Sequence, residues 1–337
     1  LLKRSIIFGF HAMKKFQKTP INSGRILDAP KFNWVDRFCP SWSKPFLKLS
    51  RFDRPIGTWL LLLPCWWGST FAILSVSSEP TAHDYWIFFS CIFGSILMRG
   101  AGCTWNDISD QKYDAKVLRT RLRPIPTGQI SSTGALIWML LQVFLALLIL
   151  LTFNSVAIVV GFIAIIPVLI YPFAKRFTWW PQFFLGIAFN WGILLSFAAH
   201  TQTIELSIVL LYFSAICWTI FYDTIYAFQD SNDDALIGLK STALLFGQAA
   251  VKWLTAFVCL SCVLMICSFY IISETLSNTQ LIIILSGILV FSLHLFGQLK
   301  HFDSNNPALC LKLFKSNRNA GLILLSALVL SIYSSNI

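Results

Sequence analysis

The chain has 337 residues, of which 56% are hydrophobic and only 12% are charged, and its mean hydropathy is +0.69. Soluble domains carry about 25% charged residues, so this composition excludes an ordinary water-soluble protein and predicts a membrane protein. The net charge is +11, but the basic residues are spread over many loops, which argues against a nucleic-acid partner.

The first 50 residues are basic and poor in acids. Seven lysines and arginines between Lys3 and Lys31 alternate with apolar residues such as Ile6 and Phe16. This pattern is typical of an organelle transit peptide, with a basic tail beside the first membrane span as the alternative. We therefore expect residues 1–50 to be a presequence and N-terminal tail, and residues 51–337 to form one membrane domain.

Hydropathy predicts an all-α, polytopic membrane protein with nine transmembrane helices in one bundle, each about 17–25 residues long. The predicted spans are 58–77, 85–104, 134–153, 155–173, 182–199, 205–222, 249–273, 279–299 and 319–335. Longer polar loops at 105–133, 223–248 and 300–318 alternate with short turns.

The loop charges support nine crossings. With this count, all 26 lysines and arginines fall in, or beside, the loops on the N-terminal side. The opposite side holds only Glu79, Asp84, Glu205 and Glu274. The positive-inside rule is thus obeyed, and both aspartate-rich loops open on the positive face.

Cys259 and Cys262 form a CxxC pair inside an apolar run. No second pair and no histidine lies nearby in the sequence to complete a zinc site, so the pattern favours packing over metal or redox use.

A first polar cluster straddles the end of the second span. If the helix continues through it, Arg99, Asn106, Asp110 and Asp114 share one stripe, because their offsets match the 3.6-residue helical period. Arg99 lies about one turn or more inside its span, where a charge is costly and usually functional. We assign it to a substrate anion, with a snorkelling interface arginine as the alternative.

A second cluster follows the sixth span, where Asp223, Asp230 and Asp234 repeat the same offsets. Two acidic stripes pointing the same way predict carboxylates that converge across a cavity, whereas a single one would be explained by solvated helix caps. Clustered acids in a low dielectric need a cation, and oxygen ligands favour Mg²⁺ shared with substrate phosphates. The substrate is therefore expected to carry a diphosphate.

A basic tract beside the first cluster offers counter-charge for that diphosphate, or simply topogenic charge. It comprises Lys112, Lys116, Arg119, Arg121 and Arg123.

The sequence resembles the UbiA-type intramembrane prenyltransferases from about Arg51 to the last span. The most specific stretches are RFDRPIGTWL from Arg51, NDxxDxxxD from Asn106 to Asp114, RPIPTG ending at Gly128, YDTIYA from Tyr222 and IGLKSTA from Ile237. The second DxxxD of the family falls on Asp230 and Asp234, and its YxxxK on Tyr171 and Lys175.

The resemblance implies a central cavity, two Mg²⁺ ions and a lateral opening for a long isoprenoid. Asp110, Asp114, Asp230 and Asp234 would be the catalytic, metal-holding residues, with Asn106 assisting. Tyr171 and Lys175 would contact the diphosphate, Arg99 would bind the acceptor carboxylate, and Asp223 is a further candidate as metal ligand or base.

The implied reaction moves a polyprenyl chain from polyprenyl diphosphate to the ring of 4-hydroxybenzoate, ortho to the hydroxyl, in ubiquinone biosynthesis. The implied location is the mitochondrial inner membrane, with the mouth toward the matrix and other ubiquinone-biosynthesis enzymes as partners. Homogentisate, naphthoate or a porphyrin are alternative acceptors. An ion-coupled transporter would instead place its acids at mid-membrane, and an intramembrane aspartyl protease would need mid-span aspartates in a GxGD context.

Overall fold

The computed structural model describes residues 30, 32–77, 79–115 and 120–334. Across these residues the chain is helical and contains no strand, which confirms the predicted fold class. Most of the expected presequence lies outside the described residues, and so do Lys116 and Arg119 of the basic tract.

The helices follow the predicted spans closely. The long ones are α4 (Ile56–Val76), α5 (Ala82–Ser109), α7 (Ser132–Leu150), α8 (Ser155–Ile163), α9 (Ile165–Phe177), α10 (Pro181–Thr201), α11 (Leu206–Ala227), α14 (Ala250–Ile271), α15 (Asn278–His301) and α16 (Pro307–Tyr333). The short ones are α2 (Trp34–Phe38), α3 (Lys44–Leu49), α6 (Gln111–Asp114), α12 (Ser231–Leu236), α13 (Thr242–Phe246), η3 (Gly247–Ala249) and η4 (Ser273–Thr275).

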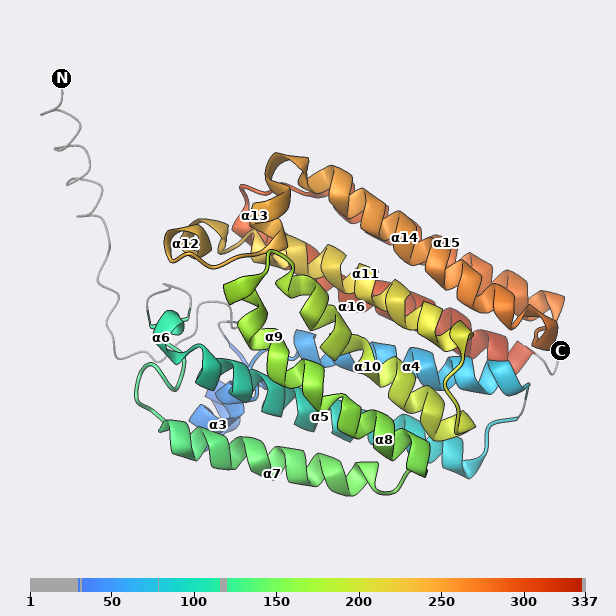
Figure 1. Ribbon diagram of the computed structural model, residues 1–337, viewed down its shortest axis with the longest axis horizontal. Helices are drawn as coiled ribbons and strands as arrows, with labels where there is room; N and C mark the ends of the chain where they lie inside the picture. The colour runs from blue at the N-terminus through green and yellow to red at the C-terminus, as the bar shows by residue number, and fades with distance from the viewer. Residues whose placement is uncertain (1–29, 31, 78, 116–119, 335–337) are drawn as a thin grey trace, which may run out of the picture.

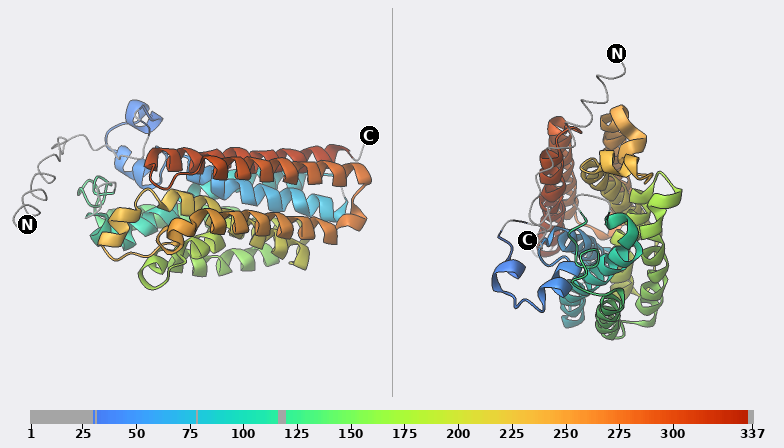
Figure 2. Two further views of the ribbon diagram at one scale, coloured as in Figure 1. Left: turned by 90° about the horizontal axis from the view of Figure 1, so that it is seen from above. Right: turned by 90° about the vertical axis from the view of Figure 1, so that its left-hand side faces the viewer.

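Eight helices among the described residues are long and apolar enough to cross a membrane, counting α8 with α9 and α13 with α14 as one each. The ninth predicted span corresponds to α16, whose first half carries Lys312, Lys315 and Arg318 and is therefore more polar. Because α16 runs beside α15 and packs against α4, it completes the predicted bundle (Figures 1 and 2).

The predicted span 155–173 is divided at Ala164 into α8 and α9. Pro167 explains the division, because proline has no N–H to donate to the carbonyl of Ile163 four residues earlier. Pro172, inside α9, removes a second such bond one turn before Lys175. The prolines thus loosen the helix that carries two predicted site residues.

The middle of the bundle is built on α4 and α11, the most buried of the membrane helices. The rings of Trp67 and Trp218 stack with centroids 4.9 Å apart, and both are fully buried. Gly68 lets α4 approach α10 closely, since a Cβ there would lie 2.3 Å from the carbonyl oxygen of Ile193. Small residues at such crossings are typical of membrane bundles, where close packing replaces the hydrophobic effect.

Exposed tryptophans and tyrosines gather at both ends of the bundle. Tyr85, Trp86, Tyr270 and Tyr333 lie at the end where α16 finishes, and Trp179, Trp253, Trp34 and Trp42 at the other. Such aromatic belts mark the two membrane–water interfaces. Figure 1 places α6 and α12 together beyond one of these ends, so both acid-rich loops emerge on the same side.

Candidate active site

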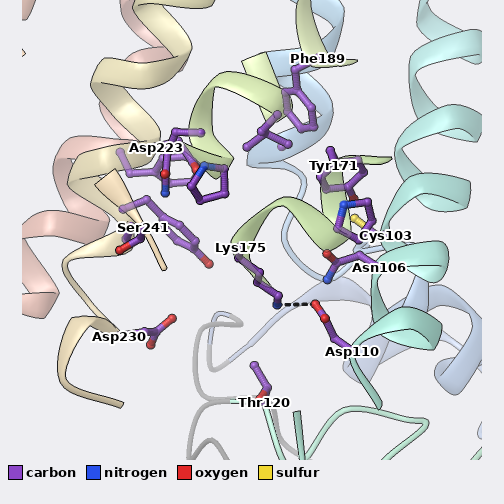
Figure 3. Close-up of a pocket in the computed structure, with 18 of the residues that line it drawn as sticks. Cys103, Asn106, Asp110, Thr120, Tyr171, Lys175, Phe189, Asp223, Asp230 and Ser241 are labelled. Carbon is purple, nitrogen blue, oxygen red and sulfur yellow. Dashed lines mark hydrogen bonds and ion pairs between the residues drawn. The ribbon is translucent and has the colours of Figure 1, made fainter. Parts of the chain in front are cut away.

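A pocket of about 310 Å³ opens at the end of the bundle where α6 and α12 lie. Its walls come from α4, α5, α6, α9, α10, α11, α12 and α16. All nine predicted site residues line it: Arg99, Asn106, Asp110, Asp114, Tyr171, Lys175, Asp223, Asp230 and Asp234. The two acidic clusters, far apart in the sequence, therefore face a common cavity, with Asp110 and Asp230 on opposite sides of it (Figure 3).

The continuous helix assumed for the first cluster is wrong. Helix α5 ends at Ser109, and the backbone of Asp110 (φ −100°, ψ 6°) separates it from α6. The carboxylate of Asp110 makes no cap bond to α6 and instead forms ion pairs with α9. The chain thus turns where α5 leaves the apolar layer, but Asn106, Asp110 and Asp114 still reach the same pocket.

The second cluster breaks in the same way. Helix α11 ends at Ala227, and Asp230 (φ −114°, ψ 5°) is the N-cap residue just before α12. The two breaks are equivalent: the backbone N–H of Asp114 donates to the carbonyl of Asp110 at 2.9 Å, and that of Asp234 to the carbonyl of Asp230 at 2.8 Å. The repeated offsets in the sequence therefore correspond to a repeated local fold, a long helix followed by a turn at one aspartate and a short helix bearing the next.

Asp110 is fully buried, and its charge is balanced by two cations from α9. The Nζ of Lys175 forms an ion pair with Oδ2 of Asp110, drawn as the dashed line in Figure 3. The Nη2 of Arg176 lies 3.3 Å from Oδ1 of Asp110 and donates to the carbonyl of Ser109 at 2.6 Å. The predicted diphosphate ligand Lys175 is thus already held at the first acidic cluster.

Arg99 faces the inner part of the pocket between α4 and α10. Its guanidinium carbon lies 5.0 Å from the ring centroid of Phe189, a cation–π distance. Its Nε is buried and makes no hydrogen bond to any described residue. Gly57 leaves room for it, since a Cβ on Gly57 would lie 2.4 Å from Nη2 of Arg99. The arginine is therefore fixed in place with hydrogen-bonding capacity left for an anion.

Tyr171 lies deeper than the resemblance implied. Its hydroxyl donates to the carbonyl of Gly102 at 3.0 Å, joining α9 to α5. Figure 3 places Tyr171 near Cys103 and Asn106, farther from Asp230 than Lys175 is. Its contact with the diphosphate stays a prediction, and the hydrogen bond to Gly102 gives it a part in holding the pocket wall.

Asp107 was given no role in the sequence interpretation, although it stands inside the NDxxDxxxD run. It is fully buried and does not line the pocket. Its Oδ1 accepts hydrogen bonds from Nη2 of Arg51 at 2.5 Å and from Nη1 of Arg123 at 3.0 Å. The same Nη1 of Arg123 donates to Oδ2 of Asp114 at 2.7 Å. Helical spacing does not set Asp107 apart, because a residue three positions before Asp110 lies on a similar face of a helix, so its direction is revealed only by its contacts with Arg51 and Arg123.

Of the predicted basic tract, only Arg123 lines the pocket among the residues that the structure describes. Lys112 and Arg121 are exposed and do not line it. Arg51 and Arg54, which precede α4, line it instead. The counter-charge for an anion therefore comes from Arg51 and Arg54 as well as from the predicted Lys175 and Arg123.

The donor set fits a hard divalent cation. Five carboxylates line the pocket together with the amide of Asn106: Asp110, Asp114, Asp223, Asp230 and Asp234. Burial raises the pKa of the Asp114 carboxyl despite the nearby Arg123, so an additional cation would favour its charged form. In the described part of the chain, no three carboxylate, histidine or cysteine side chains are grouped so that they could hold a metal ion by themselves. Mg²⁺ suits such an open site, because it usually takes few protein ligands and completes its shell with water and phosphate.

Comparisons with known proteins identify a family for the chain. Residues 61–327 match the model of the UbiA prenyltransferase family. The chain is 43% identical over 313 residues to the mitochondrial 4-hydroxybenzoate polyprenyltransferase of Homo sapiens, covering 92% of this chain and 81% of that protein. It is also 43% identical over 289 residues to the enzyme of that name from Bos taurus, covering 85% and 75%.

Solved structures show the same fold. A UbiA homologue from Aeropyrum pernix K1 superposes with a TM-score of 0.67 at 20% identity, over 81% of this chain and 97% of that one. A UbiA homologue from Archaeoglobus fulgidus, bound to GPP and Mg²⁺, gives a TM-score of 0.61 at 19% identity, over 86% and 99%.

Proposed function

The chain belongs to the UbiA prenyltransferase family, and from this premise we propose that it transfers a polyprenyl chain from polyprenyl diphosphate to the ring of 4-hydroxybenzoate, the acceptor in the names of its relatives. One observation carries the proposal: acidic clusters from both halves of the chain face a single pocket that also holds Lys175 and Arg99. A diphosphate and a carboxylate would each find counter-charge there.

At the mouth, Asp110, Asp114, Asp230 and Asp234 would hold Mg²⁺, with Asn106 assisting. When bound, Mg²⁺ would offset the negative charge on the diphosphate and make it a better leaving group. Lys175 already lies beside Asp110, and its ammonium would donate to the diphosphate oxygens as their charge grows. Asp223 lines the pocket on α11, as Tyr222 and Tyr226 do, and is a further candidate as metal ligand or base.

In the inner pocket, Arg99 would bind the acceptor carboxylate and so aim the ring at the donor. The allylic C–O bond breaks with its electrons on the diphosphate, the ring carbon ortho to the hydroxyl forms the new C–C bond, and a ring proton leaves. Phe189, which lies against Arg99, presents an aromatic face to this region. Burial excludes water, which would otherwise capture the allylic cation as an alcohol.

The relatives' names also support a mitochondrial location. We propose that the chain lies in the inner membrane with its pocket open to the matrix, because the basic loops share the pocket side. Residues 1–50 would serve as presequence and tail, residues 51–337 as the catalytic domain, and other enzymes of ubiquinone biosynthesis as partners. An ion-coupled transporter is disfavoured, since both acidic clusters lie at one end of the bundle.

The test is reconstitution of the full chain in liposomes with Mg²⁺, a labelled polyprenyl diphosphate and a panel of acceptors: 4-hydroxybenzoate, homogentisate and a dihydroxynaphthoate. We expect label to reach 4-hydroxybenzoate preferentially, and only when Mg²⁺ is present. Transfer to another acceptor in preference to it would overturn the substrate, and no transfer to any acceptor would overturn the activity.

A further inference from the structure

Asp107 lies next to the pocket, in contact with the segment before α4 and the segment after α6. It follows Asn106 on α5 but points away from the cavity, into a buried space between the chain before α4 and the loop after α6. Arg51 enters this space from the first segment and Arg123 from the second. A buried carboxylate is stable only when such partners compensate it, so the three residues form one charge unit.

Arg123 connects this unit to the acidic cluster of the pocket. Its Nη1 is shared between Oδ1 of Asp107, at 3.0 Å, and Oδ2 of Asp114, at 2.7 Å. The loop that carries Arg123 also holds the backbone of α6, because the hydroxyl of Thr120 donates to the carbonyl of Asp114 at 2.9 Å. Both the side chain and the backbone of Asp114 are thus fixed by residues 120–123.

Arg51 is held in its own place by two features. Its backbone has φ +60°, a left-handed conformation that non-glycine residues seldom adopt. Its Nη1 also donates to the carbonyl of Lys48 at 3.1 Å. The guanidinium of Arg51 therefore reaches Asp107 from a fixed backbone turn, which orients the carboxylate that Arg123 shares.

We propose that Asp107 is a positioning residue: by sharing Arg123 with Asp114, and with Arg51 in support, it holds Asp114 ready to bind the metal–diphosphate group. This rests on the function proposed above. Without the charge of Asp107, Arg123 would pair more strongly with Asp114 and compete with the metal for its oxygens. A residue that supports a metal ligand in this way typically contributes about 10- to 100-fold to metal affinity.

The experiment measures Mn²⁺ binding, as a probe for Mg²⁺, by electron paramagnetic resonance on the full chain in detergent without substrate. We expect Asp107→Asn to weaken binding roughly tenfold, because Arg123 then competes with the metal for Asp114, and Arg123→Gln to weaken it similarly, because Asp114 loses the side chain that positions it. The double variant should be no worse than either single change, because both act through one arrangement. Asp233→Asn is the matched control, since Asp233 lies on α12 and does not line the pocket.

Two further measurements separate positioning from a general loss of stability. The KM for 4-hydroxybenzoate should stay unchanged in Asp107→Asn, because Arg99 lies in another part of the pocket. If Asp107→Asn does not fold, Arg51→Lys keeps the charge but cannot bond Asp107 and Lys48 together, and it should weaken Mn²⁺ binding by a few-fold.

The inference would be overturned if Asp107→Asn bound Mn²⁺ with wild-type affinity. If Asp107→Asn does not fold, wild-type Mn²⁺ affinity in Arg51→Lys would overturn it. So would a double variant whose loss equals the product of the single losses. A wild-type chain that binds Mn²⁺ and transfers prenyl groups leaves the proposed function standing in either case. A wild-type chain that does neither overturns the proposed function, and this inference with it.

Discussion

Lys175 and Asp110 form an ion pair that joins the C-terminal end of α9 to the turn between α5 and α6. Because Asp110 is fully buried and also lies beside Arg176, it keeps one counter-ion when the lysine turns to a substrate. We expect Lys175→Ala to raise the KM for polyprenyl diphosphate, since a charge-assisted hydrogen bond is worth about 1.5–3 kcal/mol, or roughly 10- to 100-fold. Steady-state kinetics with the acceptor saturating would measure this, and an unchanged donor KM together with an unchanged kcat would remove Lys175 from the diphosphate site.

Asp230→Asn should abolish Mg²⁺-dependent transfer, because it removes one of the carboxylates proposed to hold Mg²⁺ in the pocket. Asp110→Asn should do the same. The control is Asp233→Asn, on the same short helix but off the pocket, which should keep near wild-type activity. Label incorporation and membrane insertion would be followed together, so that loss of activity is distinguished from loss of protein. Full activity in Asp230→Asn would defeat its assignment as a metal ligand.

Arg99→Ala should weaken binding of the acceptor and leave binding of the prenyl donor unchanged. Arg99 lines the pocket and forms no ion pair with any described residue, so an acceptor carboxylate would supply a partner that the chain leaves open. We expect the KM for 4-hydroxybenzoate to rise about tenfold or more, with the KM for the prenyl donor within about twofold of wild type. Equal effects on both substrates would mean that Arg99 shapes the pocket rather than binding the acid.

Gly57→Ala tests the same site without removing any charge. The added Cβ would lie 2.4 Å from Nη2 of Arg99, so the guanidinium would have to move away from α4. We expect a rise in the acceptor KM of about tenfold, in the same direction as Arg99→Ala. Gly94→Ala is a matched control on α5, because nothing lies within 4 Å of a Cβ there. Wild-type kinetics in Gly57→Ala would show that the arginine has room to adapt.

The fold could be predicted from the sequence because hydropathy and loop charge depend on local composition. Most span boundaries agree within about five residues, but α16 begins at Pro307 and not near residue 319, and the fourth span is divided at Ala164, where Pro167 removes a backbone donor. The pairing of the two acidic clusters could be predicted from their equal spacing. The turns at Asp110 and Asp230 could not be predicted, since helical periodicity does not tell where a helix ends.

The buried ion pairs were also beyond the sequence. Asp107 meets Arg51 and Arg123 only because segments before α4 and after α6 come together in space. A motif gives the residues of such a run without telling which of them face the substrate. Only tertiary contacts separate Asp107, in the protein interior, from its neighbours Asn106 and Asp110, which line the cavity.

Lys315 offers a test of whether α16 helps to receive the diphosphate. It lines the pocket next to Phe314, whose ring centroid lies 4.4 Å from that of Tyr226. Lys312, on the same helix, is equally exposed but does not line the pocket. We expect Lys315→Ala to raise the donor KM about threefold at low salt, and the difference to shrink as salt screens the charge. Lys312→Ala should change neither the donor KM nor its dependence on salt. If both variants behave alike, the lysines of α16 serve membrane topology and not substrate capture.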